Sequence, residues 1–240
     1  RRMVQKTKSK DRLPVLDRSH SQVSEKNPGF ESYPDFDDVS KENWSNPFKE
    51  IKKDKVDVAL DISTSIIGYC VLDTSGNLLK LGNIKLTSSK FDDIYDKADE
   101  VKRQLGDIVD VSTQEVSRIF VEEAHMKFTS GHSSAKTLFA LATFNGIICQ
   151  IFYDRFKVKP IKVGVRTARS KLGIKINTAD KSSTTKDKVL KIVMTLHPEF
   201  PWESHIAKTG KSTGQVVYGA QNFDMADAFI IARGGQLIYK

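Results

Sequence analysis

The sequence has few cysteines and no long apolar run. Two cysteines among 240 residues exclude a disulfide scaffold and a zinc cluster built from cysteines. The longest nearly apolar stretch, Gly146 to Phe152, contains Gln150 and is far shorter than the roughly 18 apolar residues that a membrane span needs. The basic first residues run into acidic ones and not into an apolar stretch, so no secretory signal peptide is expected. We therefore expect an intracellular protein that crosses no membrane.

Acidic residues are outnumbered by basic ones. The chain has 30 Asp and Glu against 38 Lys and Arg, a formal net charge of +8. Such a surplus fits a nucleic acid or another anionic surface as the partner and by itself proves neither. The chain is 39% hydrophobic, which at this length is enough to bury a core.

The composition changes near residue 55. Four of the seven prolines precede this point, in a stretch rich in Ser, Lys and Asp that shows no sustained apolar period. We expect residues 1–55 to form an irregular, partly disordered extension and residues 56–240 to form one folded domain. The extension also carries five spaced aromatic residues, which leaves open whether it docks onto the domain or reaches DNA or another partner: Phe30, Tyr33, Phe36, Trp44 and Phe48.

Hydrophobic periodicity in the domain predicts strands and helices in a mixed order. The predicted strands are 56–61, 67–72, 78–86, 118–122 and 160–165, and the predicted helices are 91–109, 133–156, 186–196 and 224–238. Short connections between the first three strands indicate an antiparallel meander. The later alternation of helix and strand indicates a mixed α/β sheet with helices on its faces. The helix at 133–156 is so apolar that we expect it to be buried on more than one side.

Carboxylates stand at the ends of several of these elements. Asp61 ends the first strand and Glu122 the fourth; Glu123 points to the opposite face, so only one of the two glutamates can share a site with Asp61. Asp224 and Asp227 are three residues apart, on one face of the last helix. Each of these carboxylates, taken alone, has a plainer explanation, such as a turn-forming aspartate or an acidic helix N-terminus. Their recurrence at element ends favours a common site.

Clustered carboxylates repel one another unless cations lie between them. Hard oxygen ligands without His or Cys suit Mg²⁺ or Mn²⁺. Two such ions about 4 Å apart can activate water and stabilise the leaving oxygen of a phosphodiester. A basic surface that holds phosphates around an acidic metal pocket therefore predicts a nuclease.

The residues around these carboxylates resemble the motifs of the RuvC-type Holliday junction resolvases. Residues 59–69 resemble the first motif, a strand aspartate followed by a Ser/Thr turn and Gly-Tyr. Residues 120–126 resemble the second motif, residues 134–148 the long helix after it, and residues 224–232 the closing Asp-x-x-Asp-Ala motif. The four motifs occur in the family's order across most of residues 56–240.

The resemblance implies an RNase H-like fold, with a mixed five-stranded sheet of a three-strand antiparallel meander and two parallel strands, flanked by helices. It implies a homodimer that resolves four-way DNA junctions by paired symmetric nicks, in a compartment that contains DNA. Two Mg²⁺ ions per active site, replaceable by Mn²⁺, would be bound by Asp61, Glu122, Asp224 and Asp227, which would thus be catalytic.

The resemblance also implies residues that contact DNA. Basic side chains at Arg166, Arg169, Lys171, Lys186 and Lys188 lie where the family places cations near the scissile phosphate; a solvated helix face is the plainer interpretation. Lys186 is favoured as a catalytic residue, because it opens a helix after a Ser/Thr-rich loop that could approach phosphates.

The sequence departs from the family pattern at three places. His125 stands where family members often have an aromatic residue that stacks at the junction; it could stack on a base, titrate, or be an ordinary surface histidine. The segment 198–220 is an apparent insertion, and the extension at 1–55 is an addition. The sequence predicts no role for either of the last two.

Three other functions are kept as alternatives. The same fold could serve a nuclease of RNA–DNA hybrids or other branched DNA, since metal ligands do not encode substrate shape. An ATP-dependent protein of the actin and sugar-kinase fold opens with a similar hairpin, but the chain has no second Asp-x-Gly-Thr hairpin. A non-catalytic DNA-binding relative is disfavoured because all four carboxylates are present.

Overall fold

A computed structural model describes five stretches of the chain: residues 52–87, 89–123, 135–176, 183–210 and 213–240. The chain divides into two units, Arg1–Pro47 and Phe48–Lys240, and all described residues belong to the second. The expected extension at 1–55 lies almost wholly outside the described residues, so that division stays a prediction. The first strand begins at Asp54, two residues before its expected start.

The centre of the domain is a five-stranded sheet in the order β3-β2-β1-β4-β5. The strands are β1 (Asp54–Ile62), β2 (Ile66–Asp73), β3 (Leu78–Lys85), β4 (Gln114–Glu122) and β5 (Pro160–Val163). β1 to β3 form an antiparallel meander, whereas β4 pairs parallel to β1 and β5 parallel to β4. The expected mixed five-stranded sheet, a three-strand antiparallel meander with two parallel strands, is confirmed.

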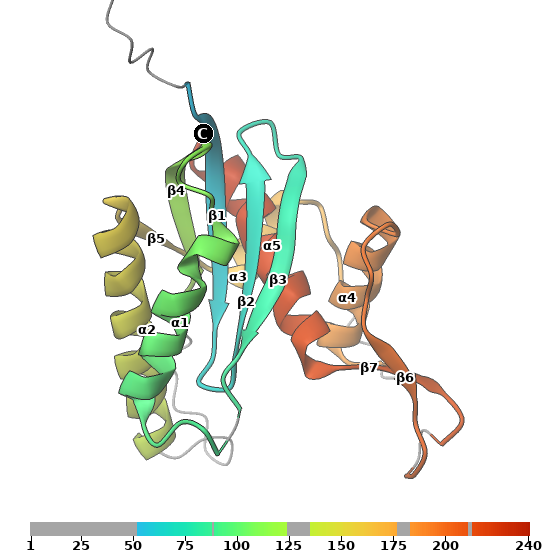
Figure 1. Cartoon of the computed structure of the whole chain (residues 1–240). Coiled ribbons are helices and arrows are strands. Elements are labelled where there is room, and N and C mark those ends of the chain that lie inside the picture. Colours follow the sequence, from blue (N-terminus) through green and yellow to red (C-terminus); the bar gives the residue numbers. More distant parts are fainter. Residues whose placement is uncertain (1–51, 88, 124–134, 177–182, 211–212) are drawn as a thin grey trace, which may run out of the picture. The chain divides into compact units, whose positions relative to one another are not determined.

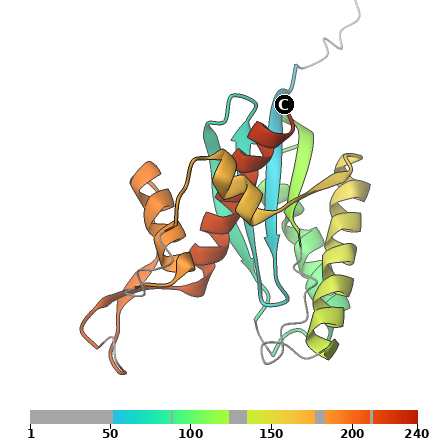
Figure 2. The same ribbon diagram turned by 180° about the vertical axis from the view of Figure 1, so that it is seen from behind.

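Helices cover both faces of this sheet (Figures 1 and 2). The helices are α1 (Ile94–Ile108), α2 (Ala135–Phe156), α3 (Val165–Lys171), α4 (Thr185–Leu196) and α5 (Ala220–Ile238). α1 and α2 pack on one face, and α3, α4 and α5 contribute to the core on the other. A short hairpin that the sequence did not predict, β6 (Ser204–Ile206) and β7 (Val216–Tyr218), forms a separate two-stranded sheet.

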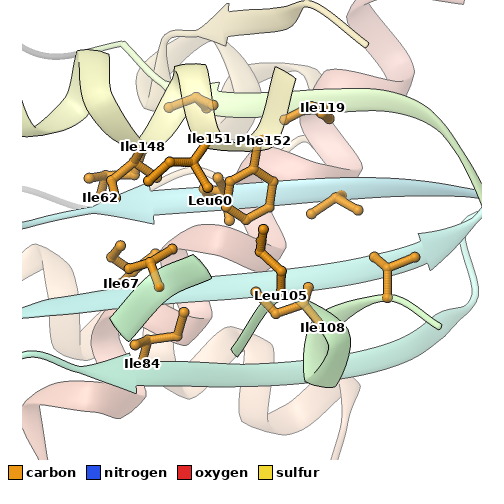
Figure 3. Packing of buried hydrophobic residues seen from close by; sticks show 14 of the residues in the cluster. Leu60, Ile62, Ile67, Ile84, Leu105, Ile108, Ile119, Ile148, Ile151 and Phe152 are labelled. Carbon is orange, nitrogen blue, oxygen red and sulfur yellow. The ribbon is translucent and has the colours of Figure 1, made fainter. Parts of the chain in front are cut away.

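The central strand β1 shows why the sheet is sandwiched between helices. Val58, Leu60 and Ile62 belong to the core beneath α1 and α2, where Leu60 lies near Phe152 of α2 (Figure 3). Ala59, on the opposite face, belongs to the core beneath α5. Because both faces are covered, β1 is buried from Val56 to Ile62, and the two polar residues in this stretch, Asp57 and Asp61, lie on the α5 face and not in solvent.

The long helix α2 differs from expectation. Its buried residues lie on one side, among them Phe144, Ile148 and Phe152, while Phe139 is 69% exposed and Gly146 faces open space. The expectation of burial on several sides was therefore wrong, because the sheet covers only one face of the helix. By length and composition alone, α2 is long and apolar enough to cross a membrane. Within the domain, 28% of its most apolar 18-residue stretch is buried.

The C-terminal half of α5 is held to the sheet by a buried ion-pair network. The fully buried carboxylate of Asp57 accepts hydrogen bonds from Nε and Nη2 of Arg118, at 2.9 and 2.5 Å, and from Nε2 of Gln236, at 2.7 Å. Arg118 donates in turn to the carbonyl of Tyr239, at 2.6 Å. The network joins β1, β4 and α5, and every charge in it is paired.

Asp57→Ala should therefore destabilise the domain strongly. It leaves the guanidinium of Arg118 partly buried without its carboxylate, and removing one partner of a buried pair costs about 3–5 kcal/mol. The free energy of unfolding in urea measures the loss. Asp99→Ala is the matched control, because Asp99 pairs with Lys102 on the exposed face of α1 and such pairs contribute about 0–1 kcal/mol. Equal losses in the two variants would contradict a structural role for the network.

Candidate functional site

Asp61 lies near the carboxyl end of β1, on the face that packs against α5. It shares this face with Ala59, two residues earlier, and only 8% of it is exposed. Across the antiparallel pair it stands opposite Gly68 of β2. A carboxylate this buried is strongly desolvated, so its charge has to be compensated by a proton or a cation.

Glu122 reaches Asp61 because β4 runs parallel to β1 and ends at the same edge of the sheet. Glu122 shares the α5 face of β4 with Phe120, and its side chain is hydrogen-bonded to Asp61. The neighbouring glutamate, Glu123, lies instead beside Gly164, which caps α3. The structure thus brings Glu122, and not Glu123, to Asp61.

α5 supplies the other two carboxylates. The helix begins at Ala220, four residues before its expected start, so Asp224 and Asp227 lie beyond its first turn. The alternative explanation of an acidic helix N-terminus is therefore weaker than it was from sequence, because the dipole effect is concentrated in the first turn. Both aspartates act electrostatically on Asp61.

The pKa values of the aspartates show how closely the four carboxylates are gathered. Burial, followed by the hydrogen bond and charge of Glu122 and the charges of Asp227 and Asp224, raises the pKa of Asp61 well above its usual value. Burial raises the pKa of Asp227 to about 6, with Lys186 opposing and Glu122 reinforcing the shift. Burial also raises the pKa of Asp224. Without a divalent cation the cluster therefore favours protonation.

Gly68 allows α5 to approach the sheet at this point. A Cβ on Gly68 would lie 2.2 Å from the carbonyl oxygen of Asp224 and 2.8 Å from the amide nitrogen of Met225. Both atoms belong to the backbone of α5 and cannot move aside as a side chain would. The glycine thus sets the distance between the strand that carries Asp61 and the helix that carries Asp224, a role that its place in the motif did not reveal.

Two of the expected basic residues lie at the cluster. A capping box between Thr184 and Asp187 fixes the start of α4 and places Lys186 in its first turn. The Nζ atom of Lys186 is 3.5 Å from Oδ1 of Asp224. Burial opposes the charge of Lys186, but the nearby aspartates outweigh it and raise the pKa of its ammonium group.

Arg169 of α3 is the second cation at the cluster. Its charge partly offsets the rise in the pKa of Asp227 that burial causes. Its Nε atom is buried without a hydrogen-bond partner among the described residues. Arg166 and Arg169 also line a cavity of about 280 Å³ beside the C-terminal end of α3.

The remaining expected DNA contacts are more dispersed. Lys171 is exposed at the end of α3, and Lys188 is partly buried in α4. His125 lies outside the described residues. The structure therefore brings Lys186 and Arg169 to the carboxylates, and leaves the others as predicted DNA contacts.

The donor atoms suit a hard divalent cation, although their arrangement is not that of a closed metal site. No group of three or more acidic, His or Cys side chains in the described part of the chain is arranged as a set of metal ligands. Glu122, Asp227 and Asp224 are nevertheless close enough to Asp61 for their charges to raise its pKa. The hydrogen bond between Asp61 and Glu122 requires a proton, which has to leave before both carboxylates can bind one cation. A divalent cation would draw the repelling carboxylates together, so the donor set is compatible with a metal site that closes when the cation binds.

Comparison with known proteins gives similarity in structure alone. No family model matches the sequence, and no curated protein matches it. Two solved structures of RuvC from Thermus thermophilus are similar, each at 14% identity over 76% of this chain and 93% of the other. The one in complex with a Holliday junction substrate has a TM-score of 0.49, and the other one of 0.47. A transcriptional regulator of the ROK family is similar over 49% of this chain, at 9% identity and a TM-score of 0.34. RuvC gives its name to the resolvase family that the sequence motifs resemble.

Gly68→Ala should lower the free energy of unfolding by about 1–3 kcal/mol or more, the usual cost of inserting a methyl group into a packed interior. The cost arises because the new methyl group overlaps the backbone of α5 at Asp224. Chemical denaturation measures it. Gly106→Ala is the matched control: a Cβ on Gly106 in α1 meets nothing, so this variant should be neutral or gain up to about 1 kcal/mol from helix propensity. If both variants were as stable as the native protein, the close approach of α5 would be refuted.

Proposed function

We propose that the protein is a metal-dependent, structure-selective endonuclease that resolves four-way DNA junctions by paired symmetric nicks. The observation that carries the proposal is the gathering of Asp61, Glu122, Asp224 and Asp227 from three separate elements into one largely buried cluster. A stable fold gains nothing from placing repelling acids together, so the cluster is explained by a cationic ligand.

The ligand that fits is Mg²⁺, with Mn²⁺ as a substitute, and two ions per site. Bound there, such ions would supply charge stabilisation and a water of lowered pKa for phosphodiester hydrolysis. The carboxylates of Asp61 and Glu122 hold the sheet side of the site, and those of Asp224 and Asp227 hold the helix side. All four are then acceptors only, and none is free to act as a proton donor.

Cationic side chains complete the proposed site. Lys186 and Arg169 lie at the carboxylates, which supports the proposal that they contact the scissile phosphate and balance negative charge when DNA is absent. Arg166, Lys171 and Lys188 are proposed as further phosphate contacts, and His125 as a junction contact. With a net charge of +8, the chain as a whole favours DNA and a compartment that contains it.

Symmetric nicking needs two active sites, and we propose that a homodimer supplies them through the outer face of α2. No charged residue occurs from Thr137 to Tyr153, so the outer face of α2 is uncharged over this length. Phe139 on this face is nevertheless largely exposed to solvent. Lys136 and Asp154 are 18 residues apart (154 − 136), about five turns, and so lie on the same side of the helix. A two-fold axis that packs two copies of α2 antiparallel would therefore bring Lys136 near Asp154 of the partner subunit.

The cleavage assay compares a mobile four-way junction, a linear duplex, a flap and an RNA–DNA hybrid in the presence of Mg²⁺. Paired symmetric nicks are expected in the junction alone. Asp61→Asn should still bind the junction but cut it at least about 100-fold more slowly. Mutating a residue that merely supports a metal ligand already lowers metal affinity or activity about 10–100-fold, and Asp61 is itself a proposed ligand. Asp99→Asn, which changes an exposed carboxylate on α1, is the control and should cut normally. Cleavage of the hybrid alone would favour the alternative nuclease, and undiminished cutting by Asp61→Asn would reject the proposed site.

Phe139→Glu should convert the dimer to a monomer, because two charges would be buried against an apolar face without partners. Sedimentation velocity measures the change. Tyr95→Glu is the matched control, since Tyr95 is a similarly exposed aromatic residue on α1 and its replacement should leave the dimer intact. A dimer that survives Phe139→Glu unchanged would show that α2 is not the contact surface.

A further inference from the structure

The hairpin β6–β7 has no role in the site described above, yet it is fixed to the helix that carries the aspartates. The side chain of Asn222, in the first turn of α5, is fully buried and donates to the carbonyl oxygen of Glu203 at 2.6 Å. Gln221 donates to the carboxylate of Glu203, and Nζ of Lys85 on β3 lies 3.6 Å from it. The base of the hairpin is thus anchored two residues before Asp224, and the position of the hairpin is coupled to that of the carboxylates.

Beyond this base the hairpin exposes an apolar pair. Ile206 and Val216 stand directly opposite each other across the two strands, and they are 63% and 60% exposed. A cross-strand pair projects from the same face of a ribbon, so the two side chains form one apolar ridge. A two-stranded hairpin gains little stability by itself, and a ridge that stays in water does not help it to fold. The ridge is therefore better explained by something that it contacts.

The charge of the hairpin indicates the kind of partner. No Asp or Glu occurs from Ser204 to Gly219, in a chain that is 28% charged. His205 on β6 and Lys208 just after it are both exposed. An apolar ridge with a lysine beside it and no acidic residue complements an anionic surface that also offers apolar faces. A DNA branch point is such a surface, because its phosphates are negative and its bases are incompletely stacked.

We propose that the β6–β7 hairpin is a DNA-contacting ribbon that places Ile206 and Val216 against unstacked bases at the branch point, while Lys208 contacts a neighbouring phosphate. The inference rests on the proposed function and extends it to an element outside the metal site. Apolar side chains are known to wedge between base steps, and two-stranded ribbons fit the grooves of DNA. A second copy of the chain is a poorer partner, since a ridge of two side chains is far smaller than the roughly 1,200 Å² that a specific protein interface buries.

The first test removes the ridge and keeps the strands. In the double variant Ile206→Thr and Val216→Thr both residues stay β-branched, so the hairpin is preserved while its apolar character is reduced. Titration into a four-way junction with 2-aminopurine at the branch point, in EDTA so that no cleavage occurs, reports affinity and unstacking together. Native protein should raise the fluorescence, and the double variant should lose the rise and bind roughly tenfold more weakly.

A matched variant separates the ridge from exposed apolar residues in general. Leu79, on β3, is 48% exposed and lies outside the hairpin. Leu79→Thr should bind the junction and unstack its bases as native protein does. Equal fluorescence and affinity in the native protein and the hairpin double variant would overturn the inference.

The second test concerns the phosphate contact. Lys208→Gln should reduce the slope of log affinity against log salt by about one, whereas Lys159→Gln, at an exposed lysine between α2 and β5, should leave it unchanged. An unchanged slope in Lys208→Gln would show that Lys208 contacts no phosphate and would overturn that part of the inference. If the double variant changed the sedimentation of the protein but not its DNA binding, the ridge would contact protein, and the inference would be rejected.

Failure of the inference can be distinguished from failure of the proposed function. Native protein is assayed in parallel for Mg²⁺-dependent nicking of the same junction. If it nicks the junction and the hairpin variants bind normally, only the inference fails. If native protein neither binds nor nicks the junction, the proposed function fails and the inference fails with it.

Discussion

The structure depends on the close approach of one helix to one strand, with acidic side chains held between them. α5 can lie on the sheet at Asp61 only because Gly68 has no side chain to separate them. The same approach removes water from Asp61 and Asp227, which raises the free energy of their charged forms. Close packing and electrostatic repulsion thus oppose each other at one point of the fold, a conflict that the proposed cation would resolve.

Two aspartates on the same strand illustrate two ways in which a buried charge can be compensated. Asp57 and Asp61 are four residues apart and face the same helix. Asp57 is satisfied by the chain itself, through Arg118 and Gln236, and therefore needs no ligand. Asp61 instead has acidic neighbours that raise its pKa, and the cation Lys186 lies at Asp224 and not at Asp61. The first aspartate serves stability, and the second leaves its charge available to a ligand.

Sequence patterns were sufficient for the sheet, because its strands depend on local periodicity. The strands β1 to β3 could be located from their apolar runs, and Asp61 from its place at a strand end, whereas the preference for Glu122 over Glu123 came from the resemblance to the family motif. The start of α5 was missed, since Gln221 and Asn222 are polar and resemble a loop. Periodicity alone also could not show that α2 has an uncovered face, because an apolar helix has the same sequence whether protein or another molecule covers it.

Features that need two distant parts of the chain were beyond the sequence. Arg118 is 61 residues from Asp57 (118 − 57), and nothing near either residue identifies the other as its partner. The role of Gly68 depends on where α5 comes to lie. The hairpin β6–β7 was missed because its strands have three residues each, too few for an alternating pattern.

The pairing of the first strand with the last helix has a consequence for synthesis. β1 and α5 are the first and last described elements, and the strand is translated more than 150 residues before the helix is complete. Contacts between such distant segments form late, since the intervening chain must first be ordered. The nascent polypeptide therefore exposes Asp61 to solvent while it is still on the ribosome, and the acidic pocket exists only after the C-terminal helix has emerged.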